Sequence, residues 1–426
     1  MKEVMLSIIV PVYNGEKFLE RCLNSIVINL SDKIRVIVID DGSTDASGVI
    51  ADQYAAKYNN IYVIHQENAG LVASRSRGIA ESRGKYISFI DADDWIDADY
   101  FDLYIDEMEA DPTIDIAITG MLRNDALGNT FGKADAYEEM VGSRQAIRNM
   151  CKKRRYHWYL WGKVYRRELF ENLIVDEAVN IFEDLDRNWQ IFSKANKVFY
   201  SGAKCYHYFQ NTAGMTEQRC KINDNSWRVF KRIIGSGIED LEVRQCMVNF
   251  YYQVYLRLLV ELYFKHKDSA YAEISAHVKE LGQTMKGIDI IPDCVDREIY
   301  NQTTETAELC MVFLRKLFSS MEATVLAAQE SAKQLFVYGT GVVSLYVAEY
   351  IRRHNVQVAA YVVSDGQLRK QEFCGRPVYY LSDVSEKEDS VFLLALSSNM
   401  HPIIRELLGA KRQGDVYAVD FPPILF

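Results

Sequence analysis

The first 120 residues alternate between short apolar runs and stretches in which apolar residues recur with helical spacing. From Glu16 to Leu30 they follow one another every three or four positions, which predicts an amphipathic helix. Further helices are predicted near 46–58, 70–82 and 98–109. The apolar runs between them predict strands at Leu6–Val10, Arg35–Asp40, Ile61–Ile64, Tyr86–Ile90 and Ile114–Thr119. Such alternation is typical of an α/β fold, in which helices cover both faces of a mostly parallel sheet.

The pattern changes in the second half of the chain. Residues 220–330 contain long helical segments such as NFYYQVYLRLLVELYF, in which interspersed Tyr, Arg and Glu favour a buried helix over a membrane-surface helix. From Lys333 the strand and helix alternation returns, in QLFVYGTG, VQVAAYVVSD, SVFLLALSS and DVYAVD. We therefore predict an α/β domain over 1–219, a helical connector over 220–330 and a smaller α/β domain over 331–426.

Composition and charge exclude several classes of protein. The chain has 426 residues, 49% of them hydrophobic, which is enough for two or three cores. Its net charge of -10 argues against nonspecific binding to nucleic acid or anionic lipid. The eight cysteines are scattered without a C-x-x-C pair, which indicates reduced thiols instead of a zinc site or a disulfide framework. No segment approaches the roughly 20 apolar residues of a bilayer span, and we expect a cytoplasmic protein.

Polar residues follow several predicted strands. Pro11 and Tyr13 come after the first strand and Asp41 after the second. The stretch FIDADDW places three carboxylates, Asp91, Asp93 and Asp94, after the strand that ends at residue 90. Ligands of open parallel sheets bind beyond the carboxyl ends of the strands. We therefore expect one crevice to collect an aromatic ring and a group of acidic oxygens.

The spacing of Asp91 and Asp93 suits a hard cation. Two carboxylates on a turning loop can approach one Mg²⁺ or Mn²⁺, with water or substrate phosphate in the remaining positions. The alternative is a solvated acidic turn that caps a helix starting near Asp97, because Asp is favoured at helix starts.

Several stretches occur together in one known family. LSIIVPVYNGEKFLERCLNSI, VIVIDDGSTD, HQENAGLVASRSRGI and GKYISFIDADDW stand in that family's order and spacing, and LWGKVYRREL and IFEDLD follow further along. On these stretches, over roughly residues 5–215, the chain resembles the family 2 glycosyltransferases, which are inverting enzymes of the GT-A fold. The resemblance implies a UDP-sugar donor and a divalent cation, Mn²⁺ or Mg²⁺.

The resemblance also implies roles for individual residues. The residues that would bind the nucleotide sugar are Pro11, Tyr13, Asp41, Arg75, Asp91, Asp94 and Lys163. Tyr13 would lie against the uracil ring and Asp41 would hydrogen-bond the base, although a turn-forming role before Gly42 remains open for Asp41. Asp93 would bind the metal, with Asp91 as a further metal or ribose ligand. The sequence departs from the family at Ser76, where the family has Asn, and this leaves the local hydrogen bonding open.

The family's Glu-Asp pair is matched by Glu183 and Asp184. Inversion requires a base that takes the proton of the acceptor hydroxyl. The resemblance assigns this role to Asp184, with Glu183 positioning the acceptor; a solvated helix surface is the alternative for the pair. Lys163 or Arg166 would help the cation to stabilise charge on the leaving diphosphate. Exposed basic residues at a helix start are the alternative for these two.

The stretch VYGTGVVS outlines a dinucleotide fingerprint in the C-terminal domain. Gly339 and Gly341 lie between a predicted strand and helix, and Asp365 closes the next strand. The third small residue is Ser344 instead of Gly or Ala. The domain also resembles nucleotide-binding-like domains appended to sugar-modifying enzymes. A bound nucleotide or sugar nucleotide, a structural role, acceptor positioning and oligomer formation all remain open.

Together these observations favour transfer of a hexosyl or N-acetylhexosaminyl group from a UDP-sugar to a saccharide or glycoconjugate, in bacterial surface polysaccharide or glycan synthesis. A lipid-linked acceptor would bring peripheral membrane contact, and a homo-oligomer stays open. A sugar nucleotidyltransferase would need a Gly-rich phosphate loop after the first strand, and PVYNGEKF is not one. A noncatalytic scaffold that binds donor or glycan for a partner transferase is the remaining alternative, and the joint presence of the acidic motifs argues against it.

Overall fold

The computed structural model divides the chain into two compact units, Met1–Cys246 and Met247–Phe426. The residues that it describes are 4–124, 130–131, 137–151, 156–179, 182–209, 224–236, 240–248, 250–251, 276–277, 280, 322, 324–326, 328–330, 333–340, 342–364, 371–384, 390–395 and 416–418. Most of the predicted helical connector, including 252–264 of its long apolar segment, lies outside these residues. The division into three domains therefore stays a prediction.

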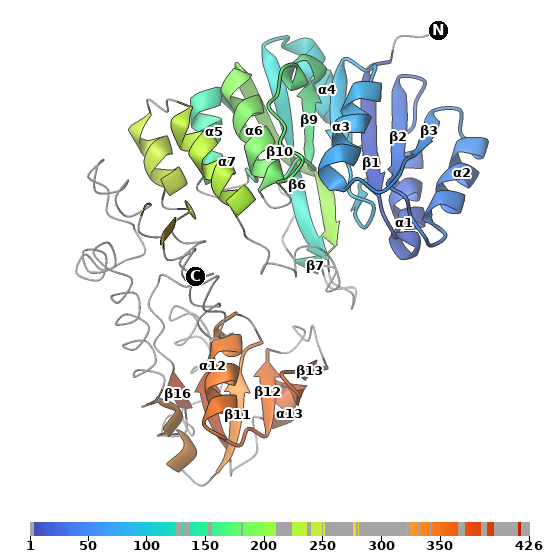
Figure 1. Ribbon diagram of the computed structural model, residues 1–426. Coiled ribbons are helices and arrows are strands. Elements are labelled where there is room, and N and C mark those ends of the chain that lie inside the picture. Colours follow the sequence, from blue (N-terminus) through green and yellow to red (C-terminus); the bar gives the residue numbers. More distant parts are fainter. Residues whose placement is uncertain are drawn as a thin grey trace. The chain divides into compact units, whose positions relative to one another are not determined.

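The first unit is built on one ten-stranded mixed sheet (Figure 1). Its strands are β1 (Leu6–Val12), β2 (Ile34–Asp40), β3 (Ile61–His65), β4 (Tyr86–Phe89), β5 (Trp95–Ile96), β6 (Ile114–Asn124), β7 (Thr130–Phe131), β8 (Glu138–Gly142), β9 (Lys163–Arg166) and β10 (Lys197–Phe209). The main path runs β3-β2-β1-β4-β9-β6-β10-β5. The first four strands are parallel, β6 and β10 are parallel to each other, and β9 runs antiparallel between β4 and β6.

Helices cover this sheet. They are α1 (Glu16–Val27), α2 (Ser47–Lys57), α3 (Leu71–Glu81), α4 (Asp102–Ala110), α5 (Ser143–Cys151), the 3₁₀ helix η1 (Arg167–Phe170), α6 (Glu183–Lys194) and α7 (Asp224–Gly235). Helix α3 packs on β1 and β2, α4 on β6, and α5 on α6. Every residue of β1 is buried, as expected for a parallel strand covered on both faces.

A close approach between α3 and β1 positions the site. A Cβ atom added at Gly78 would lie 2.4 Å from a methyl carbon of Ile9, so only glycine allows the helix to pack this near the strand. Arg75 lies three residues earlier on the same helix, which places it on nearly the same face. The close packing therefore directs Arg75 into the protein at the carboxyl ends of the strands.

The predicted α/β class is confirmed for this unit, and so are the first four strands and the first four helices, to within a few residues at their ends. The helix expected to start near Asp97 begins instead at Asp102, because Trp95–Ile96 pair with β10 as the short strand β5. The predicted strand at residue 114 extends to Asn124. Strands β8, β9 and β10 were not predicted, because they are held by long-range pairing.

The second unit contains a smaller sheet. Its elements are β11 (Gln334–Tyr338), α12 (Val342–Arg353), β12 (Ala360–Val363), β13 (Glu372–Phe373), β14 (Arg376–Tyr380), α13 (Leu381–Val384), β15 (Ser390–Leu394) and β16 (Val416–Ala418). The strand order is β13-β14-β12-β11-β15-β16, and all strands except β13 pair in parallel. A separate apolar core, including Phe336, Val362 and Phe392, holds the sheet together.

None of the helices in the described part of the chain combines the length and the apolar content that a bilayer span requires.

Candidate active site

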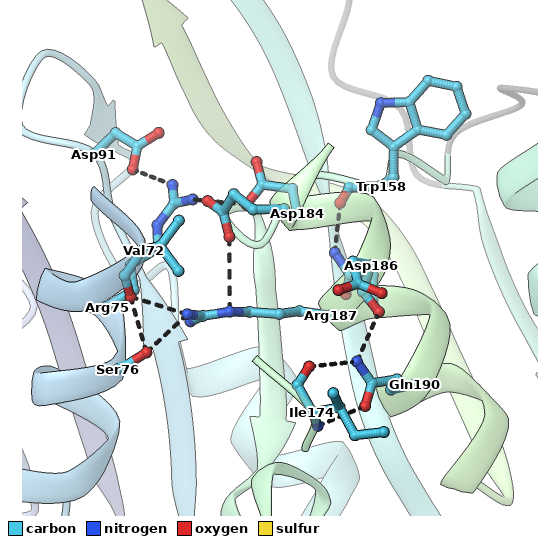
Figure 2. Close-up of polar contacts among 12 residues, drawn as sticks. Val72, Arg75, Ser76, Asp91, Trp158, Ile174, Asp184, Asp186, Arg187 and Gln190 are labelled. Carbon is cyan, nitrogen blue, oxygen red and sulfur yellow. Dashed lines mark hydrogen bonds and ion pairs between the residues drawn. The ribbon is translucent and has the colours of Figure 1, made fainter. Parts of the chain in front are cut away.

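One buried arginine joins three carboxylates from distant parts of the chain. Arg75 on α3 donates from Nη2 to Oδ1 of Asp91 at 2.8 Å and from Nη1 to Oδ1 of Asp184 at 2.6 Å (Figure 2). Nη1 also bonds Oε1 of Glu183. Asp91 belongs to the acidic loop after β4, whereas Glu183 and Asp184 begin α6. The residues of three separate motifs therefore form one cluster.

This cluster keeps Arg75 charged. Burial alone lowers the pKa of an arginine, but the negative charges of Asp184, Asp91 and Glu183 outweigh burial and raise the pKa of Arg75 well above its ordinary value. The planar guanidinium has five donors in a fixed geometry, which lets one side chain bond several carboxylates. Three acidic groups around it leave local negative charge, which suits a site that receives a cation.

The two carboxylates at the start of α6, Glu183 and Asp184, differ in their exposure to solvent. Phe182, directly before the helix, has a φ of 68°, which is uncommon for a bulky residue and marks local backbone strain of the kind that clusters at functional sites. The side chain of Glu183 is 9% exposed and lies 3.7 Å from Nε of Arg187, one helical turn later. The side chain of Asp184 is 20% exposed. Asp184 is therefore the more accessible of the two.

The environment of Asp184 favours proton acceptance. Burial raises the pKa of Asp184 well above its usual range, the charge of Arg75 opposes this, and Glu183 and Asp91 add to the rise. A carboxylate with a raised pKa holds a proton more readily near neutral pH than an ordinary one does. The low exposure of the two side chains, 9% for Glu183 and 20% for Asp184, argues against the alternative of a solvated helix surface for the pair.

Ser76 has a defined role in place of the family's Asn. Its hydroxyl donates to the carbonyl oxygen of Val72 at 2.8 Å and accepts from Nη2 of Arg187 at 2.8 Å (Figure 2). The same Nη2 also donates to the Val72 carbonyl at 2.9 Å. The side-chain hydroxyl of Ser76 on α3 therefore connects this helix to α6 through Arg187. Sequence reasoning missed Arg187, although its position four residues after Glu183 is the spacing of helical ion pairs.

The acidic loop is fixed from β10. The hydroxyl of Tyr206 donates to Oδ2 of Asp94 at 2.6 Å and accepts from the backbone N–H of Asp91 at 3.1 Å. Oδ1 of Asp94 accepts from the backbone N–H of Phe209 at 2.7 Å, and the Asp94 side chain is fully buried. This differs from the expectation that Asp94 contacts the nucleotide sugar. Both oxygens of Asp94 are engaged within the protein, so the geometry supports a role in shaping the loop.

Arg21 on α1 holds the same loop from the other side. Its Nη2 donates to the carbonyl oxygen of Asp93 at 2.6 Å. Its guanidinium carbon lies 4.0 Å from the ring centre of Trp95 and 4.7 Å from that of Phe209, within the range of cation–π attraction. No local sequence signal marks Arg21, because its partners lie more than 70 residues away.

The residues expected around the nucleotide lie at the ends of β1 and β2. Pro11 is buried, and Tyr13 is 54% exposed with its ring accessible to a ligand. Asp41 accepts three bonds, from Gln66 Nε2 at 2.7 Å and from the backbone N–H groups of Ala69 and Gly70 at 2.9 and 2.8 Å. A carboxylate has about four acceptor sites, so these three hydrogen bonds leave Asp41 able to accept from one further donor.

The alternative of exposed basic residues at a helix start is wrong for Lys163 and Arg166. Both are buried on strand β9. Arg166 donates to the carbonyl oxygen of Ile114 at 2.9 Å and pairs with Asp115 at 3.2 Å, which makes it structural. Nζ of Lys163 donates to the carbonyl oxygen of Tyr159 at 2.6 Å. Burial lowers the pKa of Lys163 to about 7, and the charge of Asp184 opposes this.

The donor set of the acidic loop fits a hard divalent cation. Asp91 and Asp93 offer carboxylate oxygens, the ligands that Mg²⁺ and Mn²⁺ prefer, and both side chains are partly exposed. Oδ1 of Asp91 accepts a hydrogen bond from Arg75, which leaves Oδ2 for a cation. Within the described ranges no group of three or more His, Cys, Asp or Glu is assembled for a metal. Two protein ligands therefore need water or substrate phosphate to complete the coordination.

In the second unit the fingerprint is only partly described. Gly339 follows β11 with a φ of 117°, a conformation that favours glycine, and Gly341 and Asp365 lie outside the described residues. Ser344, which replaces the usual third glycine, is buried and donates to the carbonyl oxygen of Ala395 at 3.1 Å. Its hydroxyl therefore ties α12 to the end of β15.

Comparison with known proteins agrees with the predicted resemblance. The profile described as Glycosyl transferase family 2 matches residues 7–174. Two Bacillus subtilis (strain 168) proteins whose names describe them as glycosyltransferases are similar. EpsJ is 35% identical over 218 residues, which cover 50% of this chain and 63% of EpsJ. EpsH is 32% identical over 242 residues, which cover 56% of this chain and 67% of EpsH.

A solved structure supports the fold. TarS 1-349 of S. aureus, crystallised in complex with UDP-GlcNAc, matches with a TM-score of 0.51 and 18% sequence identity over 71% of this chain and 91% of that chain. This likeness confirms the predicted GT-A type of fold and no more. The match to the family profile and the extent of the match to EpsH show that the chain belongs to glycosyl transferase family 2.

Proposed function

We propose that the protein is an inverting, divalent-metal-dependent glycosyltransferase. It would move a sugar, of the hexosyl or N-acetylhexosaminyl class, from a UDP-sugar to a hydroxyl of a saccharide or glycoconjugate in surface polysaccharide or glycan synthesis. One observation carries the proposal: Arg75 joins the acidic loop, which would face the donor diphosphate, to Asp184, which would face the acceptor. The donor and acceptor halves of the reaction thus share one rigid cluster.

The donor would bind along the ends of β1 and β2. Tyr13 would stack on the uracil ring and Pro11 would line the same pocket, while Asp41 would use its remaining acceptor site for the base. Arg75 would set the position of Asp91 beside the ribose and diphosphate. The bonds of Lys163 to Tyr159 and of Asp94 to Tyr206 support positioning roles for these two residues instead of donor contacts.

Asp91 and Asp93 would hold the cation, which when bound would neutralise charge on the leaving diphosphate. Asp184 would take the proton from the attacking acceptor hydroxyl. Glu183, which contacts Arg75 and Arg187, would keep Asp184 in position. Attack from the side opposite the diphosphate inverts the anomeric centre, because nucleophile and leaving group then occupy opposite faces of the sugar.

Release of UDP from a panel of UDP-sugars in the presence of Mn²⁺, with and without candidate acceptors, tests the proposal. Turnover of at least one donor is expected. Donor binding without any turnover, even with acceptors supplied, would favour a noncatalytic scaffold.

Asp93→Ala is expected to abolish metal-dependent UDP binding and transfer. Asp91 is already bonded to Arg75 and cannot replace the lost carboxylate, so the cation would lose an inner ligand. Titration of UDP by calorimetry, with Mn²⁺ and then with excess EDTA, measures the effect. Full activity of the wild-type protein in excess EDTA would refute the metal requirement.

The second unit is proposed to be a Rossmann-like domain. If β11 is counted as the first strand, its five parallel strands follow the order 3-2-1-4-5, which is the order of doubly wound sheets. The bond from Ser344 to Ala395 supports a structural use of the fingerprint helix.

A further inference from the structure

An aromatic segment, residues 157–161, lies between the acidic loop and α6. Its sequence is HWYLW, and it directly precedes Gly162 and strand β9. Leu160 and Trp161 are buried, whereas His157 and Trp158 are partly exposed and Tyr159 is 36% exposed. Aromatic side chains thus reach the surface from a segment that is otherwise anchored in the core.

Three successive carbonyl groups of the segment are each held by a buried side chain. Asn188 Nδ2 donates to the oxygen of Trp158 at 2.5 Å (Figure 2). Lys163 Nζ donates to the oxygen of Tyr159 at 2.6 Å, and Tyr165 Oη donates to that of Leu160 at 3.1 Å. Donors this deeply buried are costly to leave unpaired, so these bonds fix the backbone firmly. A segment that only connected two elements would not need three such anchors.

The aromatic side chains also stack on one another toward the acidic loop. The rings of Tyr159 and Trp161 lie 4.6 Å apart at an interplanar angle of 8°, and those of Trp161 and Tyr206 lie 4.6 Å apart at 12°. Tyr206 is the residue whose hydroxyl bonds both Asp91 and Asp94. The exposed ring of Tyr159 is therefore connected, through two buried rings, to the loop proposed to hold the cation.

The other end of the segment is connected to the proposed base. Asn188, which holds Trp158, lies four residues after Asp184 on α6, so the two residues are about 6 Å apart along the helix axis. Figure 2 shows Trp158 beside the first turns of α6, from which Asp184 also projects. The backbone of the aromatic segment is thus anchored to α6, the helix that begins with Glu183 and Asp184, and to Lys163, whose pKa responds to the charge of Asp184.

We propose that Trp158 and Tyr159 form the binding platform for the pyranose ring of the acceptor. This proposal rests on the proposed function. A pyranose has a face of C–H groups that packs on an aromatic ring and a rim of hydroxyls that stays hydrated or hydrogen-bonded, and large, rigid aromatic rings supply such contact area. The fixed backbone would present one hydroxyl of the ring to Asp184. The expected acceptor is therefore a saccharide, recognised through its sugar ring.

Tyr159→Ala and Trp158→Ala are expected to raise the acceptor concentration for half-maximal transfer about tenfold each, and Tyr159→Phe to leave it nearly unchanged. The probes are octyl glycosides of glucose, galactose and N-acetylglucosamine, and the readout is their acceleration of UDP release. The acceleration by acceptor is expressed relative to each variant's own UDP release without acceptor. Tyr62→Ala removes a ring that is 43% exposed on β3 and serves as the matched control.

Two measurements distinguish a failure of the proposed platform from a failure of the proposed function. If no UDP-sugar turns over, the proposed function fails, and saturation-transfer NMR of the same glycosides then tests the platform without turnover. Saturable binding that is lost in Tyr159→Ala supports it. The platform is overturned if no glycoside binds the wild-type protein, if Tyr159→Ala behaves like Tyr62→Ala, or if octyl phosphate competes as well as the glycosides, since the alkyl chain would then be the bound group.

Discussion

Asp184→Asn is expected to lower sugar transfer by about 10²- to 10⁴-fold, the usual contribution of a general base, while UDP affinity and the fold are kept. The amide has nearly the shape of the carboxylate and can still accept the bond from Arg75 Nη1 through its oxygen. What it cannot do is accept the proton of the acceptor hydroxyl. Parallel measurement of UDP binding and of transfer for the purified variant tests this expectation.

Glu183→Gln is the matched comparison, because the neighbouring carboxylate bonds the same Nη1 of Arg75. Glu183 is the more buried of the pair and is held by Arg187 as well, so its neutralisation should disturb the position of Asp184 and the acceptor side without removing the base. A smaller loss of transfer is expected. If Glu183→Gln is inactive and Asp184→Asn is near normal, the base is Glu183; if both transfer normally, neither carboxylate takes the proton.

The pH profile gives a second test of Asp184. The base must be deprotonated to act, and burial raises its pKa well above the usual carboxyl range. Transfer by the wild-type protein should therefore fall on acidification at a higher pH than an ordinary aspartate would give. The residual activity of Asp184→Asn should lack this acidic limb, and retention of the limb would assign it to another group.

The sequence predicted the parts of the site that are local. Asp91 and Asp93 follow a buried strand and Arg75 lies on the helix predicted near 70–82, so the alternation and the family motifs located these residues. It could not predict which acidic side chain of the loop turns inward. Asp94 is buried because Tyr206 and Phe209, more than 100 residues away, bond its two oxygens. Such contacts depend on the pairing of β10 with distant strands, which a local pattern does not specify.

Long-range strand pairing also explains why the sequence did not predict the burial of Lys163 and Arg166. In the sequence, WGKVYRREL has the composition of an exposed helix start, with three cations in nine residues. Strand β9 instead inserts between β4 and β6, which buries Lys163 and Arg166 and pairs their polar groups with carbonyl oxygens. The pairing of β9 with β4 and β6 therefore determines the burial and the hydrogen-bond partners of Lys163 and Arg166, and it overrides the local composition.

Arg75→Met is expected to destabilise the first unit by about 3–5 kcal/mol and to abolish transfer, because it leaves Asp91, Glu183 and Asp184 without their shared cation. Arg75→Lys should recover only part of the stability, since one ammonium cannot reproduce the fork of the guanidinium. Urea unfolding, with transfer measured in parallel, tests both variants. Arg77→Met is the control on the same helix: Arg77 is 54% exposed, pairs only with the nearby Glu81 among the ion pairs of the described residues, and should cost about 0.5 kcal/mol or less.

The pH dependence of the Arg75→Met variant separates loss of charge pairing from loss of packing. Without the guanidinium, the buried carboxylates should have pKa values above those of the unfolded chain, so the folded state binds more protons than the unfolded state. The free energy of unfolding then rises as the pH falls from neutral toward the ordinary carboxyl range, and the difference from the wild-type protein narrows. A difference that stays constant over this range would mean that Arg75 acts through packing alone. Equal destabilisation by Arg75→Met and Arg77→Met would show that the carboxylate cluster does not depend on Arg75 at all.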